Sequence, residues 1–411
     1  MITYYPKLGT STSPITVVPG GNSVDAFGRL RVSNPLTIFD SKNVMSKNNL
    51  FSESLTANGT VTYTANKSTV NLNVTQVSGD KTIRQSKRVM SYQPGKSLLV
   101  FNTFIMNTLT ANLKQKVGLF DANNGIFFYA DGTTLKIVRR TYTSGSAVDT
   151  EISQSSWNGD KLNGTGSSGF TLDATKSNIL FIDIEWLGVG SVRVGFVING
   201  QLITAHTFNN ANSLTAVYMQ TANLPIRYEI ETAATLTAGT YTLQQICSSC
   251  ISEGGYAPNS VEQMIGTASI SGVNLTTAGT FYNLATIRIK TSRPYAVIVP
   301  QGFITSAISN SDFEVQLILN ATPSTAFSYT SYSDNIEYDL TGTTTITGGT
   351  IIAKTYLSGK NVSTSTIGDG FNFDYQLGQT IAGVSDTLTL CAKAAANNDD
   401  VLGTIKWYDL T

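Results

Sequence analysis

Residues 181–208 read FIDIEWLGVGSVRVGFVINGQLITAHTF, and this stretch decides the fold. Apolar side chains alternate with smaller or polar ones, Asn199-Gly200 interrupts the run, and the alternation then resumes. Asn-Gly between two alternating runs is the strongest short-range signal for a β-hairpin, because a type I′ turn needs a positive φ at both central positions. The stretch therefore predicts two antiparallel strands with one apolar face, as in a sheet that is buried on one side.

The expected register of this hairpin bears on the only histidine of the chain, His206. The predicted cross-strand pairs are Val194 with Ala205, Phe196 with Ile203, and Arg193 with His206. A neighbouring arginine disfavours the charged imidazolium, and no nucleophile motif lies in a suitable turn. We therefore interpret His206 as a sheet residue and not as a catalytic base.

Short runs with strand patterning continue along most of the chain, and no window of useful length holds the i, i+3, i+4, i+7 pattern of an amphipathic helix. Asn124-Gly125 and Asp131-Gly132 supply two further hairpin turns. The candidate strands are Val61–Tyr63, Thr69–Val74, Ser97–Phe104, Gln115–Asp121, Gly125–Ala130, Thr134–Arg140, Ile179–Trp186, Val192–Ile198, Leu202–Phe208, Thr280–Ile289, Tyr295–Pro300, Phe313–Asn320, Ile351–Leu357 and Thr387–Ala392. This pattern predicts an all-β protein built from antiparallel sandwiches of the jelly-roll or lectin-like kind.

Three segments are expected along the 411 residues. Residues 1–35 are rich in Pro, Gly, Ser and Thr and predict an extended N-terminal arm, either a disordered tail or an arm that docks on a neighbour. Residues 36–255 predict the first β-sandwich, and residues 256–411, poorer in charge, predict a second, outward-facing one. Within the second, the low-complexity stretch 341–350 (TGTTTITGGT) predicts an exposed loop or edge strand.

The composition is polar, with few charged residues and a formal net charge of zero. Lysine plus arginine equals aspartate plus glutamate, 27 each, and charged residues make up 13% of the chain, about half of the usual share of roughly 25%. A chain without a concentrated basic patch is not expected to bind nucleic acid. No apolar stretch is long enough to cross a membrane as a helix. We expect a soluble protein, made in a reducing cytosol without a signal peptide, that assembles closely with other subunits.

Two motif matches lack the sequence context that their usual functions, dinucleotide binding and redox or zinc chemistry, would need. Residues 164–169 (GTGSSG) match G-x-G-x-x-G, but neither a strand before nor a helix after them fits dinucleotide binding, so we expect a loop. Cys247 and Cys250 form a C-x-x-C without a βαβ unit beside it, and a zinc site would need two more ligands, for which only Cys391 and His206 remain among the cysteines and histidines. We interpret the cysteines as buried free thiols, and we expect no cofactor and no metal.

Carbohydrate chemistry is the remaining possibility that the residues raise. Asp183 and Glu185 lie two residues apart on one strand face, roughly 7 Å along the strand, which suits either a glycosidase pair or two solvated side chains. Tyr129, Trp157 and Tyr218 would stack on sugars if they were exposed, although core packing is the ordinary place for them. Solvated carboxylates are far commoner than catalytic ones, so we expect no enzyme.

Several segments together resemble structural proteins of tailed bacteriophages, including cyanophages. The likeness covers roughly residues 25–255. Its segments are 25–35 (DAFGRLRVSNP), 38–42 (IFDSK), 92–96 (YQPGK), 117–121 (VGLFD), 124–128 (NGIFF), 182–188 (IDIEWLG), 223–230 (NLPIRYEI) and 252–255 (SEGG). The resemblance implies a non-enzymatic virion protein, assembled in the host cytoplasm, as a tail, baseplate or fibre component.

The expected partners are other virion proteins and copies of the chain itself, as a homotrimer or a larger ring of three-fold or six-fold symmetry. Candidate assembly residues are Phe27, Arg29, Arg31 and Phe39, with the two arginines suited to carboxylates on a partner. One alternative, a capsid-decorating protein, shares every feature above, and another is a lectin-like adhesin that binds a host-surface glycan. A glycan-cleaving tailspike using Asp183 and Glu185 is less favoured, because repetitive β-helix sequence is missing.

Overall fold

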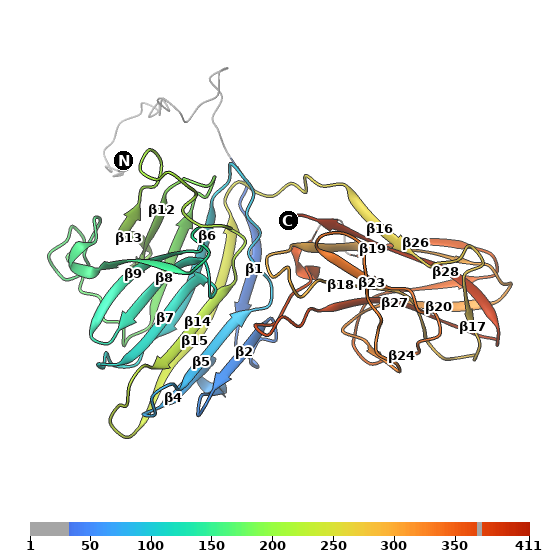
Figure 1. The fold of residues 1–411 in the computed structure, drawn as a ribbon, viewed down its shortest axis with the longest axis horizontal. Helices are drawn as coiled ribbons and strands as arrows, with labels where there is room; N and C mark the ends of the chain where they lie inside the picture. The colour runs from blue at the N-terminus through green and yellow to red at the C-terminus, as the bar shows by residue number, and fades with distance from the viewer. Residues whose placement is uncertain (1–32, 368–371) are drawn as a thin grey trace, which may run out of the picture. The chain divides into compact units, whose positions relative to one another are not determined.

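The protein is built from antiparallel β-sheets, as the sequence predicts (Figure 1). The computed structural model describes residues 33–367 and 372–411, and this part of the chain contains strands and short 3-10 turns but no α-helix. None of its helical turns is long and apolar enough to cross a membrane. The predicted arm, residues 1–35, lies almost wholly outside the described residues.

Two sheets form the first sandwich. The larger has the order β13-β12-β11-β6-β15-β4-β3, with β1 paired to β15, and the other has the order β10-β9-β8-β7-β14-β5-β2. Their bounds are β1 (Leu36–Lys42), β2 (Phe51–Thr56), β3 (Thr60–Thr64), β4 (Thr69–Thr75), β5 (Lys81–Ser86), β6 (Leu98–Ile105), β7 (Leu113–Phe120), β8 (Gly125–Asp131), β9 (Thr134–Thr141), β10 (Val148–Ser153), β11 (Asn178–Ile184), β12 (Val192–Ile198), β13 (Gln201–Phe208), β14 (Ile226–Thr232) and β15 (Thr240–Ser252). A single apolar cluster, which includes the edge-to-face rings of Phe128 and Phe196, fills the space between the sheets.

A second pair of sheets follows in the chain. One has the order β16-β28-β19-β26, with β17 paired to β28, and the other has the order β22-β23-β18-β27-β20-β25; β21 and β24 pair separately. Their bounds are β16 (Glu262–Gly266), β17 (Val273–Leu275), β18 (Tyr282–Ile289), β19 (Ile298–Ala307), β20 (Asp312–Leu319), β21 (Thr322–Pro323), β22 (Thr330–Ser331), β23 (Ile336–Asp339), β24 (Ile346–Thr347), β25 (Thr350–Ser358), β26 (Val362–Thr366), β27 (Thr387–Ala394) and β28 (Asp399–Asp409). Its apolar core is centred on residues such as Phe303 and Trp407.

The hairpin that the sequence identifies is present, with one correction to its register. Asn199 and Gly200 have φ values of 51° and 77°, as a type I′ turn requires. Phe196 pairs with Ile203 as predicted, but Val194 pairs with His206 and Arg193 with Thr207. The predicted pairing of Arg193 with His206 is wrong, because β13 carries one extra residue in a β-bulge beyond Gly195.

Gly200→Ala is expected to lower the free energy of unfolding by about 1–2 kcal/mol, because the added methyl group opposes the left-handed backbone that the turn needs. Chemical denaturation followed by tryptophan fluorescence measures this change. Asn199→Gly is the matched control, since glycine adopts the same positive φ, and we expect less than about 1 kcal/mol from it. Equal stability of Gly200→Ala and the parent would contradict the turn assignment.

Candidate functional site

The structure describes one of the four candidate assembly residues. Phe39 is 4% exposed and packs edge-on against Phe51 at 5.9 Å between ring centroids, inside the core of the first sandwich. Phe27, Arg29 and Arg31 lie outside the described residues. Phe39 therefore anchors β1 to the sandwich, and the proposed assembly role of the other three stays a prediction.

The three aromatic residues considered for sugar stacking are all buried, so core packing is confirmed for them and sugar stacking is wrong. Tyr129, Trp157 and Tyr218 are 5%, 2% and 2% exposed. The Trp157 indole donates to the Ile152 carbonyl at 3.1 Å, and the Tyr218 hydroxyl donates to the Glu185 carbonyl at 3.2 Å. Their polar tips are satisfied internally, as is usual for buried Trp and Tyr.

The surroundings of His206 and the three cysteines indicate a structural role for these residues. His206 is nearly buried; its Nδ1 accepts a hydrogen bond from the Asn158 amide at 3.3 Å, and burial lowers the pKa of the imidazole. Cys250 and Cys391 are buried free thiols, as predicted, whereas Cys247 is only half-buried. Burial raises the pKa of Cys391 to about 12, so its thiol stays protonated.

The glycine-rich segment 164–169 is a loop organised by a carboxylate. Asp160 accepts hydrogen bonds from the backbone amides of Leu162 at 2.8 Å and Ser168 at 2.6 Å. These bonds lower the pKa of Asp160 against the opposing effect of burial. Gly166 lies against this carboxylate, where a Cβ atom would come within 2.0 Å of Oδ1. The glycines therefore allow the loop to wrap around Asp160.

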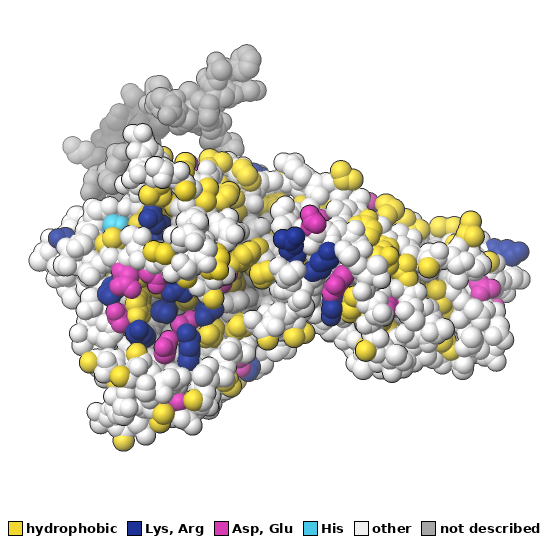
Figure 2. Space-filling model, viewed as in Figure 1, with side chains coloured by type: hydrophobic (Ala, Val, Ile, Leu, Met, Phe, Trp, Pro, Cys, Tyr) yellow, Lys and Arg dark blue, Asp and Glu magenta, His cyan; other side chains and the backbone are white. Residues whose placement is uncertain are grey.

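Charged side chains gather over β7, β8 and β9 on one face of the first sandwich (Figure 2). Glu229 on β14 accepts from Lys81 and Lys116, each at 3.0 Å, and from Arg227. Beneath them lies an outward-facing but buried apolar cluster of Phe120, Phe127, Tyr129 and Val138. We call these paired charges and rings the ionic layer. Because its charges bind one another and its rings are covered, we interpret it as a stabilising layer.

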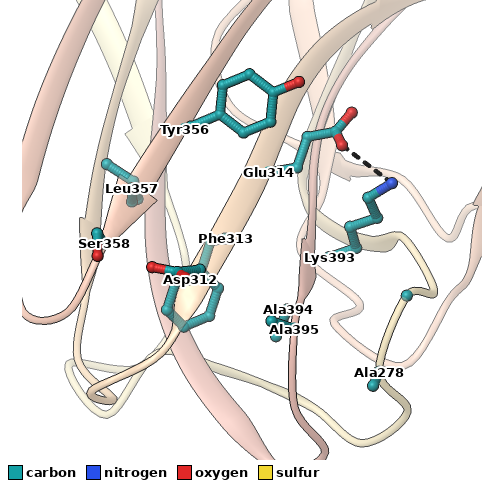
Figure 3. A pocket seen from close by; sticks show the side chains of 11 residues that line it. Ala278, Asp312, Phe313, Glu314, Tyr356, Leu357, Ser358, Lys393, Ala394 and Ala395 are labelled. Carbon is teal, nitrogen blue, oxygen red and sulfur yellow. Dashed lines mark ion pairs between the residues drawn. The ribbon is translucent and has the colours of Figure 1, made fainter.

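A cavity of about 730 Å³ lies on the second sandwich (Figure 3). It is formed where β20 begins and where β25 and β27 end. Outward-facing lining residues alternate with buried ones along each strand, as the period of two requires. The outward-facing set is Asp312, Glu314, Tyr356, Ser358, Lys393 and Ala395, and the alternating buried set is Phe313, Leu357 and Ala394. We call this cavity the Tyr356 pocket.

One cross-strand row supplies its chemistry. Glu314 on β20 is directly opposite Tyr356 on one side and Lys393 on the other. Its carboxylate binds Lys393 at 3.0 Å and Lys354 at 2.7 Å, and accepts from Gln316 at 2.6 Å. The hydrogen bond from Lys354 is the largest influence on the Glu314 pKa, which falls to about 2. Glu314 therefore remains ionised and holds both lysines in place.

Tyr356 is the most exposed part of this row. It is 68% exposed, and the Lys354 ammonium lies 4.9 Å from its ring centroid. Figure 3 shows its ring beside the Glu314 carboxylate. An exposed ring next to fixed polar groups provides an apolar platform and hydrogen-bonding partners at one place, as binding pockets commonly do.

A covering segment explains why the pocket opens at this end of the sheet. Beyond Glu314, the outer face of the sheet is covered by residues 320–350, which place Ile346 of β24 against Cys391 and Ile318. Ile346 is only 3% exposed, so the exposed-loop alternative for 341–350 is wrong at this residue, whereas β24 is an edge strand in the two-stranded sheet with β21. The sequence did not predict the Tyr356 pocket. The available signal was charged residues at outward positions of two predicted strands, Glu314 and Lys354, and Lys393 directly after a third.

The structure also brings Asp183 and Glu185 together in one pocket of about 340 Å³ on the first sandwich. Asp183 is buried and forms an ion pair with Arg193, whereas Glu185 is exposed and accepts from the Ser191 hydroxyl at 3.3 Å. Burial raises the pKa of Asp183 against the opposing effect of Arg193. In residues 33–367 and 372–411, no group of three or more His, Cys, Asp or Glu is placed to hold a metal ion.

No protein-family model matches the chain, and no curated protein matches it in sequence. Among solved structures, a Shewanella oneidensis protein of unknown function is 9% identical, with a TM-score of 0.35, over 55% of this chain and 90% of its own. A carbohydrate esterase of the Shiga toxin-encoding bacteriophage phi24B is 12% identical, with a TM-score of 0.31, over 54% and 100%. Arcelin-5, a lectin-like defence protein of Phaseolus vulgaris, is 9% identical, with a TM-score of 0.32, over 54% and 99%. Likenesses this weak carry no argument about function.

Proposed function

We propose that this protein is a non-enzymatic glycan-binding structural protein of a tailed-phage particle, and that the Tyr356 pocket holds the sugar. The observation that carries the glycan-binding part is the exposed Tyr356 ring beside the row of Glu314 and Lys393. A sugar presents an apolar face of C–H groups and a rim of hydroxyls. The ring suits the face, and the lysine ammoniums and the Asp312 carboxylate suit the hydroxyls.

The charges of the pocket favour a neutral sugar. Glu314 lies between Lys354 and Lys393, so the two ammoniums are already partly compensated, and Asp312 adds a second carboxylate at the rim. An anionic ligand would face both carboxylates, whereas hydroxyl groups can donate to Asp312 and accept from the lysines. The virion part of the proposal rests on the resemblance over residues 25–255.

The test is a glycan microarray probed with the full chain, followed by titration of the best glycan against Tyr356→Ala. We expect at least about a tenfold loss of affinity, roughly 1.4 kcal/mol, because the apolar platform is removed. Tyr356→Phe is the matched control, since it keeps the ring, and it should bind within about threefold of the parent, under 1 kcal/mol. Glycan binding that is unaffected by Tyr356→Ala would place the sugar elsewhere.

Two further measurements bear on the remaining parts of the proposal. An assay for reducing ends tests whether the protein cleaves a bound glycan. Cleavage that Asp183→Asn abolishes would overturn the non-enzymatic assignment. Cryo-electron microscopy of the intact particle tests the structural role. Density at the tail or baseplate supports it, density on the head lattice makes the chain a decorating protein, and absence from the particle overturns it.

A further inference from the structure

We infer that the pocket around Asp183 and Glu185 on the first sandwich is a second saccharide-binding site, separate from the Tyr356 pocket. This inference rests on the proposed glycan-binding function. The two pockets share no lining residue, and they belong to different sheets. We call the second one the Glu185 pocket.

The backbone brings the polar groups of the Glu185 pocket together from three elements. Lys96 and Ser97 precede β6, Asp183 lies near the end of β11, Glu185 directly follows that strand, and Arg193 lies on β12. Asp183 is directly opposite Arg193 in the sheet and binds its guanidinium. Asp183 is only 8% exposed while the Arg193 side chain is 59% exposed, and the buried carboxylate holds the arginine through Nη2 alone. The remaining guanidinium N–H groups are available as donors at the pocket.

Glu185 supplies hydrogen-bond acceptors to the pocket, whereas Arg193 supplies donors. It is exposed, and one carboxylate oxygen accepts weakly from Ser191, through the backbone amide at 3.4 Å and the hydroxyl at 3.3 Å. Its other oxygen accepts no hydrogen bond from residues 33–367 and 372–411. Glu185 accepts while Arg193 and Lys96 donate, so the pocket complements groups that both donate and accept. Vicinal sugar hydroxyls are such groups.

The loop that carries Glu185 is held in place by its own contacts, so the site is formed before a ligand binds. The Tyr218 hydroxyl donates to the Glu185 carbonyl at 3.2 Å, and the Trp186 indole donates to the Met219 carbonyl at 3.2 Å. A Cβ atom on Gly190 would come within 2.2 Å of the Glu185 carbonyl oxygen, so this tight turn depends on glycine. Preorganisation of this kind lowers the entropic cost of binding.

The size and rim of the Glu185 pocket suit a small sugar unit. Its volume, about 340 Å³, lies at the lower end of the range of roughly 300–1,000 Å³ for ligand pockets. Leu187, which is 53% exposed, is its apolar lining residue. This side chain offers contact to the C–H face of a sugar, as the Tyr356 ring does in the other pocket. With two cations and two carboxylates, the lining carries no net charge, which again favours a neutral ligand.

The experiment compares Glu185→Gln, Lys96→Met and Tyr356→Ala of the full chain on the same glycan microarray. We expect a set of signals to fall at least tenfold in Glu185→Gln and Lys96→Met while persisting in Tyr356→Ala. Glu185→Gln keeps the size of the side chain, and an unchanged unfolding midpoint confirms that it folds. Arg193 is left in place, because its removal would leave Asp183 as an uncompensated buried carboxylate.

The outcomes separate this inference from the proposed function. If Tyr356→Ala removes every signal and neither Glu185→Gln nor Lys96→Met reduces any, the second site is wrong and the Tyr356 pocket stands. If the pattern is reversed, the second site stands and the Tyr356 pocket is wrong. A wild-type chain that binds no glycan on the array overturns both.

Discussion

Arg84→Ala is expected to lower the free energy of unfolding by about 3–5 kcal/mol, the usual cost of removing one partner from a buried charged network. Arg84 is fully buried in β5. Its Nε donates to the Gln245 side chain at 2.6 Å, and Nη2 donates to the Asn48 carbonyl at 2.9 Å. The guanidinium also binds Glu53 and lies 4.8 Å from the centroid of the Phe51 ring.

The physical reason is that the buried Gln245 side chain would lose its donor inside the sandwich, and the half-buried Asn48 carbonyl and Glu53 carboxylate would each lose one. Burial lowers the pKa of Arg84, and Glu53 opposes this effect, so the charge is retained by its contacts. Urea denaturation followed by tryptophan fluorescence measures the loss. Arg293→Ala is the matched control: its guanidinium lies at the surface, where it contacts the Asp334 carbonyl, and we expect a change within about 0.5 kcal/mol. Equal stability of the two variants would show that the Arg84 contacts do not hold the sheets together.

Glu229→Gln is expected to cost about 3–5 kcal/mol of stability at pH 7, because it leaves the cations of the ionic layer without their shared carboxylate. Glu229 is 2% exposed, and it contacts Lys81, Lys116 and Arg227. Glu231→Gln is the matched control. Glu231 lies on the same strand and binds Lys81 at 3.2 Å, but its side chain is 28% exposed, so we expect less than about 1 kcal/mol.

The difference in unfolding free energy between the parent protein and Glu229→Gln should depend on pH. Arg227, Lys116 and Lys81 hold the pKa of Glu229 well below its ordinary value of 4.5, despite the opposing effect of burial. Because the folded pKa is the lower one, the stabilisation is fully present above pH 4.5 and is lost as the pH falls toward the folded pKa. We expect the stability difference between the parent and Glu229→Gln to shrink below pH 4.5. A difference that stays constant from pH 7 to pH 3 would contradict the assignment.

How well each candidate site could be predicted depends on how far apart its residues lie in the sequence. Asp183 and Glu185 could be paired by inspection, because residues two apart in a strand share a face. Arg193 pairs with Asp183 on the neighbouring strand β12, and the sequence analysis did not predict this pairing. The predicted pairing of Arg193 with His206 on β13 was wrong, because a bulge cannot be read from alternation alone. The Tyr356 pocket needs Glu314, Tyr356 and Lys393 side by side, which only the pairing of β20 with β25 and β27 provides.

The sequence by itself determined the all-β class and the local hairpins, since turn chemistry at Asn199-Gly200 and alternation over a few residues are short-range properties. The tertiary structure decided what depends on distant pairing. β15 (Thr240–Ser252), whose sequence barely alternates, is a central strand because β6, β4 and β1 all pair with it. The burial of Tyr129 under Lys116 and Lys136, and the exposure of Tyr356, likewise follow from which strands meet. Side-chain burial is set by neighbours across the sheet, and those neighbours lie far away in the chain.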